Sequence, residues 1–264
     1  MRPADNYGQK WRRNVATTVK GTFAAKSDRG LVRLHNEDRA AVLLNQKGDL
    51  LFVVCDGLGG HNKGDFASKL AIDMLMTAFA NNRGFLTTNS IKRFFNKNIR
   101  AINKAIFEES ILSPDMNNMS TTLNAVVLTR SKLCNVNIGD SRFYLCTDDE
   151  MYLMSEDQTV VGYLVRTNQI TPEEALVHPK RHILTNALGT MPTVTFDFRK
   201  FQYRGERILV CSDGLYNMLD SEDILGILRT TQTAEFKVDA LVALANHRGG
   251  ADNIGVALWE PDND

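Results

Sequence analysis

The sequence predicts an α+β protein, a four-layer α-β-β-α sandwich of two antiparallel sheets with a pair of helices on each outer face. Helical patterns occur in two pairs, one on each side of a group of short strand-like runs. The connections between those runs are too short for parallel crossovers, so neighbouring strands should be antiparallel. Two sheets packed face to face, with the helices outside, bury the apolar side of each element.

The first part of the chain passes from strands into the first helix pair. Strand-like runs are expected at three places, about 21–26, 39–45 and 50–55. The third run leads into the cluster Gly57-Leu58-Gly59-Gly60. A helix is expected from about Asp65, where apolar residues recur at helical spacing. A second helix should follow Ser90, which we take as its N-cap.

The second part returns to strands and ends in the other helix pair. Four short runs, expected to form a meander, lie at 122–128, 133–138, 142–146 and 151–154. Alternation of apolar and polar residues from Val194 to Arg199 is typical of a half-buried strand. Helices are expected at 221–229 and about 234–247, and Gly249-Gly250 would stop the second.

We expect residues 21–264 to form a single domain, because the sequence shows no repeat and no linker. Residues 1–20 resemble a short basic extension without the apolar core of a secretory signal. Residues 155–190 contain few core positions, and Thr171-Pro172-Glu173-Glu174 predicts a capped helix within them. This stretch is therefore predicted to be a surface flap beside the functional site.

The composition excludes several function classes. Of the 264 residues, 43% are apolar and 23% are charged, which is typical of a soluble globular protein. A formal net charge of zero gives no support for nucleic-acid or membrane-surface binding. No apolar run is long enough to span a membrane. The four cysteines lie in apolar runs, which favours buried reduced thiols in a cytoplasmic protein over disulfides or zinc.

Five acidic motifs border predicted strands. They are Asn36-Glu37-Asp38, Asp56-Gly57, Gly139-Asp140-Ser141, Ser212-Asp213-Gly214 and Ala251-Asp252-Asn253. Each aspartate alone is most often a turn or cap residue. Five in one pattern predict a cage of oxygen ligands whose charges require cations. Oxygen ligands drawn from distant strands favour Mg²⁺ or Mn²⁺ over zinc and suit a binuclear centre that acts on phosphorus.

Basic residues near these motifs are candidates for binding a phosphoryl group or for acid catalysis. Arg33 lies three residues before the first motif, and its planar guanidinium suits bidentate phosphate binding. An ordinary surface arginine is the alternative. His35 and His61 each neighbour an acidic motif, but a lone histidine is more often structural than catalytic.

The motifs also occur in a characteristic order. The ordered series is Arg33-x-x-Asn36-Glu37-Asp38, Asp56-Gly57-Leu58-Gly59-Gly60-His61, Ser120-Thr121-Thr122, Gly139-Asp140-Ser141-Arg142, Ser212-Asp213-Gly214-Leu215 and Ala251-Asp252-Asn253-Ile254. From about residue 20 to its end, the chain resembles the metal-dependent serine/threonine protein phosphatases of type 2C, the PPM family, in their compact bacterial form.

The resemblance implies a centre of two Mn²⁺ or Mg²⁺ ions at one end of the sandwich. Asp56 would bridge the two ions, and Gly57 would offer its carbonyl oxygen to one of them. Asp213 and Asp252 would bind the other ion, and Glu37 would act on a metal through water. No organic cofactor is implied.

The resemblance also assigns roles around the two ions. Asp38 would orient metal-bound water, and Arg33 would hold the substrate phosphate. Asp140, together with Asp213, would bind a third and weaker ion. Asn253 would support the ligands without touching an ion.

The activity implied is hydrolysis of phosphoserine and phosphothreonine in proteins by metal-bound hydroxide, with a cognate serine/threonine kinase as partner. Leu58 stands where some relatives carry a histidine proposed as general acid, so that role is unassigned. Ser120 and Glu156-Asp157-Gln158-Thr159 also depart from the family pattern, which bears on substrate preference. Two alternatives are a catalytically silent phosphoprotein-binding module and a phosphatase of another phosphoester.

Overall fold

The computed structural model describes residues 20–59, 63–112 and 118–262. Its helices are α1 (Lys63–Ala80), α2 (Thr88–Leu112), α3 (Val160–Arg166), α4 (Pro172–Val177), α5 (Asp213–Tyr216), α6 (Ser221–Leu228) and α7 (Ala234–His247). Its strands are β1 (Gly21–Asp28), β2 (Asp38–Leu44), β3 (Leu50–Leu58), β4 (Ser120–Thr121), β5 (Leu123–Leu128), β6 (Leu133–Ile138), β7 (Arg142–Cys146), β8 (Met151–Leu153), β9 (Asp197–Phe201), β10 (Arg207–Cys211) and β11 (Ile254–Pro261). Residues 1–19 of the predicted extension, and Gly60 and His61, lie outside the described residues.

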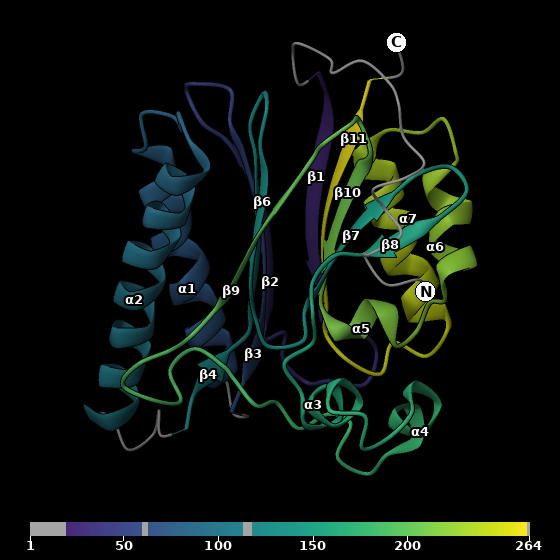
Figure 1. The fold of residues 1–264 in the computed structure, drawn as a ribbon. Helices are drawn as coiled ribbons and strands as arrows, with labels where there is room; N and C mark the ends of the chain where they lie inside the picture. The colour runs from purple at the N-terminus through teal and green to yellow at the C-terminus, as the bar shows by residue number, and fades with distance from the viewer. Residues whose placement is uncertain (1–19, 60–62, 113–117, 263–264) are drawn as a thin grey trace.

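Two sheets lie face to face, with α1 and α2 outside one and α6 and α7 outside the other (Figure 1). One sheet has the order β1-β11-β10-β7-β8, and the other has the order β2-β3-β5-β6-β9, with β4 paired to the end of β3. The pairings between these strands are antiparallel. The predicted four-layer α-β-β-α sandwich is confirmed.

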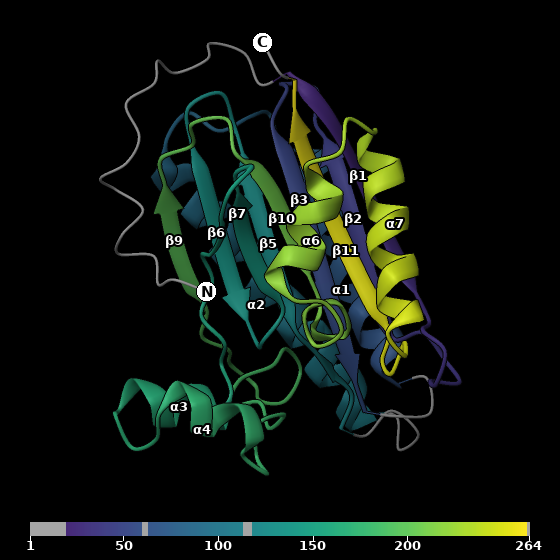
Figure 2. The same ribbon diagram turned by 90° about the vertical axis from the view of Figure 1, so that its right-hand side faces the viewer.

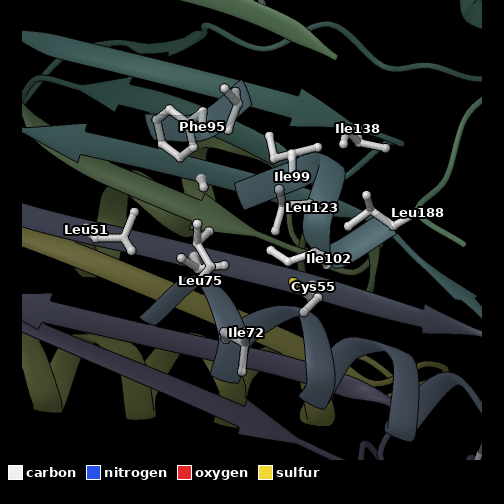
Figure 3. Close-up of a cluster of buried hydrophobic side chains, with 14 of the residues drawn as sticks. Leu51, Cys55, Ile72, Leu75, Phe95, Ile99, Ile102, Leu123, Ile138 and Leu188 are labelled. Atoms are coloured by element: carbon white, nitrogen blue, oxygen red, sulfur yellow. The ribbon is translucent and has the colours of Figure 1, made fainter. Parts of the chain in front are cut away.

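Strand β3 shows why the layers stack in this order, because it is buried on both faces. Successive side chains of a strand point to opposite faces of its sheet. Leu50, Phe52 and Val54 therefore lie between the two sheets. Leu51, Val53 and Cys55 pack under α1 and α2, and Figure 3 shows Leu51 and Cys55 beside Leu75 and Ile72 of α1. A strand apolar at every position is accommodated only between two layers.

The predicted meander is wrong in one respect. The runs β5, β6, β7 and β8 do follow one another closely, but β6 pairs with β5 and β9 whereas β7 pairs with β10 and β8. The chain changes sheet at Gly139-Asp140-Ser141, and Gly139 adopts a left-handed conformation there with φ of 95°. The crossing places Asp140 at the end of the sandwich, between the sheets.

Two element boundaries also differ from the prediction. Helix α2 begins at Thr88 rather than after Ser90, because the hydroxyl of Thr87 accepts a hydrogen bond from the Ser90 N–H and so caps the helix. The strand expected from Val194 to Arg199 is β9, Asp197–Phe201. Val194 and Phe196 instead pack against the core under α1 and α2.

Residues 155–190 carry α3 and α4, which contain no buried residue. The two helices lie beyond one end of the sheets (Figure 2). The predicted capping box is present, since the Thr171 hydroxyl accepts from the Glu174 N–H and the Glu174 carboxylate accepts from the Thr171 N–H. Burial of apolar surface in this segment is thus small compared with the sandwich.

The described cysteines are all free and buried, as predicted from their apolar surroundings. Among the described helices, none combines the length and the apolarity needed to cross a lipid bilayer.

We predict that Phe52→Ala lowers the free energy of unfolding by about 3–5 kcal/mol, because Phe52 is fully buried between the sheets and its removal leaves a cavity. Leu86→Ala is the matched control, since Leu86 is 90% exposed and should cost less than about 0.5 kcal/mol. Urea denaturation measures both. Equal effects of the two substitutions would contradict the placement of Phe52.

Candidate metal centre and phosphate site

One end of the sandwich contains a cavity of about 650 Å³. It lies where β3 and β10 end and where β11 begins. Of the residues predicted to bind metal or phosphate or to support the ligands, all except Asp38 line it, namely Arg33, Glu37, Asp56, Gly57, Asp140, Asp213, Asp252 and Asn253; His35 does not. The five acidic motifs, which are far apart in the sequence, thus come together in space.

Asp38 lies beside this cavity, directly across the β2–β3 ladder from Asp56. Burial, together with the negative charges of Asp213 and Asp252, raises the pKa of Asp38 to about 7. Burial also raises the pKa of Asp56 well above its ordinary value, and the charge of Asp38 raises it further. Two neighbouring buried carboxylates disfavour each other's charged form, so the pair calls for positive charge nearby.

The main chain of Asp56 is fixed by the Ser120-Thr121-Thr122 motif. The Asp56 N–H donates to the Thr122 hydroxyl at 2.9 Å, and the Thr121 hydroxyl donates to the Asp56 carbonyl oxygen at 2.9 Å. The Thr122 hydroxyl also lies 2.8 Å from that of Ser141. Two buried hydroxyls therefore connect β3 to the loop that carries Asp140. The sequence analysis included this motif, but its spacing did not predict that it joins β3 to the Asp140 loop.

Gly57 is required by a close contact between main chains. A Cβ at this position would overlap the carbonyl oxygen of Gly64 in α1 and would crowd that of Glu37. The Gly57 N–H donates to the Glu37 carbonyl oxygen at 3.2 Å. The absence of a side chain lets β3, α1 and the Glu37 segment meet at the cavity.

Asp140, in the loop between β6 and β7, and Asp213, at the start of α5, line the same cavity. Burial raises the pKa of Asp140 to about 7, and the charge of Asp213 adds to the effect. Burial likewise raises the pKa of Asp213, followed by the charge of Asp252, whereas His182 and Arg33 oppose the rise. The Tyr216 hydroxyl donates to the Asp140 carbonyl oxygen at 3.1 Å, which ties α5 to the Asp140 loop.

Asp252 and Arg33 form an ion pair at the rim. An Arg33 Nη2 hydrogen is donated to Asp252 Oδ2 at 2.7 Å, and the Arg33 side chain is 53% exposed. A predicted phosphate-binding residue and a predicted metal ligand are therefore partners in this structure. A cation that enters the cavity competes with Arg33 for Asp252.

Asn253 holds the loop that carries Arg33 and Glu37. Its Oδ1 accepts from the Glu37 N–H at 2.8 Å, and its Nδ2 donates to the carbonyl oxygens of Arg29 and His35 at 2.8 and 2.9 Å. Next to it, a Cβ on Gly214 would overlap the Asn253 carbonyl oxygen, which keeps the start of α5 against the start of β11.

The donor set fits a hard divalent cation. Its side-chain donors are carboxylates, the ligand type that Mg²⁺ and Mn²⁺ prefer. Within the described stretches of the chain, the buried atoms Glu37 Oε1 and Asp38 Oδ2 have no hydrogen-bond partner, so both can accept from bound water or an ion. Among the described residues, no three acidic, histidine or cysteine side chains converge on one point. The ion pair of Asp252 with Arg33 contributes to this, since it engages one of the three aspartates expected to share an ion.

The structure adds two basic residues that the sequence did not single out for this site. Arg181 and His182 of the 155–190 segment line the same cavity. His182 is close enough for its charge to lower the pKa of Asp213. These residues lie in a stretch without clear periodicity, so only the tertiary fold shows that they reach the carboxylates.

Comparisons with known proteins agree with this geometry. The family model of protein phosphatase 2C matches residues 31–246. A serine/threonine phosphatase, stp, of Listeria innocua is 38% identical over 236 residues, which cover 89% of this chain and 94% of that protein.

Solved structures give the same result. The S. agalactiae serine/threonine phosphatase has a TM-score of 0.86 and 34% identity, with 91% of this chain and 99% of that chain covered. The catalytic domain of the serine/threonine protein phosphatase PstP, solved with 2 manganese ions, has a TM-score of 0.78 and 35% identity, with 93% and 100% covered.

The four-layer fold and its carboxylate-lined cavity define a protein of the metal-dependent phosphatase class. The match to the family model extends over most of the chain, and the chain belongs to the protein phosphatase 2C family.

We predict that the EDTA-treated protein loses thermal stability as pH rises. The pKa values of Asp38 and Asp140 are raised to about 7 from an ordinary 3.8. Between these two pH values, the folded chain therefore binds more protons than the unfolded chain. The free energy of unfolding should therefore fall from about pH 4 to about pH 7. Added Mn²⁺ should restore stability most strongly at the upper end, where the carboxylates are charged.

Asp213→Asn should raise the melting temperature of the EDTA-treated protein at neutral pH and reduce the further rise produced by Mn²⁺, because it removes one of the repelling charges. Asp149→Asn, in an exposed turn, is the matched control and should change neither value. Differential scanning calorimetry with EDTA and with Mn²⁺ provides the measurement. A destabilising effect of Asp213→Asn in EDTA would show that the carboxylate is already neutralised within the fold.

Proposed function

We propose that this chain is a metal-dependent protein serine/threonine phosphatase that hydrolyses phosphoserine and phosphothreonine in proteins. The observation that carries the proposal is the convergence of the carboxylates of five separate motifs on one cavity, with an arginine at its rim. Membership of the protein phosphatase 2C family supports it. Water adds to phosphorus, the ester P–O bond breaks, and inorganic phosphate and a free hydroxyl side chain are released.

Two Mn²⁺ or Mg²⁺ ions fit this site. We assign Asp56 as the bridging ligand, the Gly57 carbonyl oxygen to one ion, and Asp213 and Asp252 to the other, with Glu37 acting through water. Bound there, two ions supply an activated water for in-line attack and neutralise charge on the phosphoryl oxygens. Support comes from the 2 manganese ions in the PstP structure.

Arg33 is assigned to the substrate phosphate. Its exposed guanidinium lies at the mouth of the cavity, and a planar fork of N–H donors matches two phosphoryl oxygens. The charge of Asp252 positions it there before substrate binds. Asp38, buried beside Asp56, is assigned to orient the water that attacks, since its Oδ2 has no hydrogen-bond partner among the described residues.

The remaining assignments concern the edges of the site. Asp140 with Asp213 is proposed for a third, weaker ion, because both line the cavity and the charge of Asp213 acts on Asp140. Asn253 is proposed to keep Glu37 in place through its hydrogen bond to the Glu37 N–H. We propose that residues 155–190 act as a flap on one domain formed by residues 21–264.

The substrates proposed are phosphoproteins, and a cognate serine/threonine kinase is a partner that we expect from the family alone. Four buried free thiols support a reducing compartment and therefore a cytoplasmic location. A silent phosphoprotein-binding module is the weaker alternative, because loss of catalysis should relieve the repulsion among carboxylates that this chain retains.

We predict that the purified protein releases phosphate from a phosphothreonine peptide with Mn²⁺ and that excess EDTA abolishes the release. Asp56→Asn should lower kcat by about a hundredfold or more, because it removes the ligand shared by both ions. Asp149→Asn, exposed and remote, should have wild-type kinetics. Peptide binding without release would favour the silent module, and release from small phosphoesters alone would favour another phosphatase.

We predict that Arg33→Gln raises KM for the phosphopeptide about tenfold or more, through loss of the bidentate phosphate contact. Its affinity for Mn²⁺, measured by isothermal titration calorimetry, should not fall, because Arg33 no longer competes for Asp252. A parallel fall in Mn²⁺ affinity and activity would show that Arg33 acts through the ion site and not on the substrate.

A further inference from the structure

A second cavity, of about 580 Å³, lies beside the first, between the sandwich and the 155–190 segment. The two cavities share five lining residues: Asp140, Arg181, His182, Asp213 and Asn217. A ligand whose phosphate occupies the first cavity can therefore extend into the second without leaving the surface of the protein. None of the site assignments above makes use of this space.

The walls of the second cavity are largely apolar. They are formed by one residue of β8, two of α3 and three of α4, namely Leu153, Val161, Val165, Pro172, Ala175 and Leu176. Neither α3 nor α4 has a buried residue, and Leu176 is 74% exposed. The apolar side chains of two helices thus face a space that the described protein does not fill.

Asp157 and Glu156, the two acidic groups that line only the second cavity, are already paired. Arg142 donates to both carboxylate oxygens of Asp157, at 3.1 and 2.7 Å, and its guanidinium lies 3.7 Å from the centre of the Tyr216 ring. Glu156 pairs with Arg166 at 2.9 Å and also contacts Arg199. These pairs neutralise the two acidic groups, so the second cavity adds no single-sign charge to that of Asp140 and Asp213, which it shares with the first.

Arg181, at the junction of the two cavities, is different. Within the part of the chain that the structure describes, its guanidinium has no acceptor. A cation without a partner at the passage between a phosphate site and an apolar space suits the main-chain carbonyls of a bound peptide. From the first cavity to the second, the protein thus suits a phosphate group, then a peptide main chain, then an apolar side chain.

We propose that the second cavity binds an apolar side chain of the substrate protein, from a residue close in sequence to the phosphorylated serine or threonine. This inference rests on the proposed phosphatase function and adds a preference for the residues around the phosphate. The volume accommodates a side chain as large as leucine or phenylalanine. Val165 and Leu176, one on each flap helix, supply the contacts.

The experiment uses phosphothreonine peptides in which one leucine is moved through the positions on either side of the phosphothreonine, in an otherwise alanine- and serine-based sequence. The full chain with Mn²⁺ should show a kcat/KM about tenfold higher for leucine than for alanine at one position, as expected when an apolar side chain leaves water. Para-nitrophenyl phosphate, which has no peptide, reports hydrolysis that does not depend on the second cavity.

The variants form a matched pair. Val165→Ser with Leu176→Ser removes apolar wall residues of the cavity, one from each helix. Tyr163→Ser with Val177→Ser removes exposed apolar residues of the same two helices that do not line it. The first pair should reduce the leucine preference to about that of alanine and leave para-nitrophenyl phosphate turnover unchanged. The second pair should keep the preference.

Equal kcat/KM for leucine and alanine at every position would overturn the proposal, as would a preference that survives the first pair or is lost equally in both. Loss of self-association in the first pair alone, measured by sedimentation, with no change in peptide preference would assign the cavity to a second copy of the chain and also overturn it. A wild-type protein that hydrolyses neither the peptides nor para-nitrophenyl phosphate would instead refute the phosphatase function.

Discussion

Mutual repulsion among buried carboxylates is the constraint on which the rest of the structure depends. Asp38 and Asp56 lie opposite each other in one ladder, and Asp140, after β6, and Asp213, at the start of α5, line the same cavity as Asp56. Burial is the largest cause of the raised pKa of each of these groups, and the neighbouring charges add to it. Only a framework stabilised elsewhere can hold such groups together. The three apolar layers, centred on the doubly buried strand β3, provide that stability.

The framework positions the carboxylates mainly through neutral contacts. Gly57 and Gly214 have no side chain, so the main chains of β3 and α1, and those of α5 and β11, can approach each other closely. The hydroxyl of Thr122 connects β3 to Ser141. Asn253 ties the Glu37 loop to β11 with three hydrogen bonds. Neutral donors fix geometry without cancelling charge, so the cavity keeps its affinity for cations. Arg33, the one arginine paired directly with a lining aspartate among the described contacts, is at the exposed rim, where the phosphate of a substrate can reach it.

Local sequence patterns predicted most of the fold and the acidic residues of the site. They did not predict the features that depend on tertiary structure, and each failure has a physical reason. Runs such as Leu50–Cys55 are short and apolar at every position, so their strands were evident. Polar turns of similar length, however, serve equally for a hairpin and for a change of sheet, so the crossing at Gly139 was taken for part of a meander. Thr87 and Ser90 are both acceptable caps, and the hydrogen bond between them decides where α2 begins. Arg181 reaches the carboxylates only through the path of a segment that has no buried helix face.

Residues 155–190 differ from the sandwich in the interactions that stabilise them. Helices as short as α3 and α4 are not stable alone, and they lack a buried face to compensate. Ion pairs at the start of the segment, Asp157 with Arg142 of β7 and Glu156 with Arg199 of β9, attach it to the sandwich beside the cavity instead. Partly exposed ion pairs contribute little stability and tolerate rearrangement. Changes in α3 and α4 therefore leave the carboxylate framework intact while they reshape the space next to it. We infer that selection among substrates is separable from the hydrolytic centre, because the two depend on different interactions.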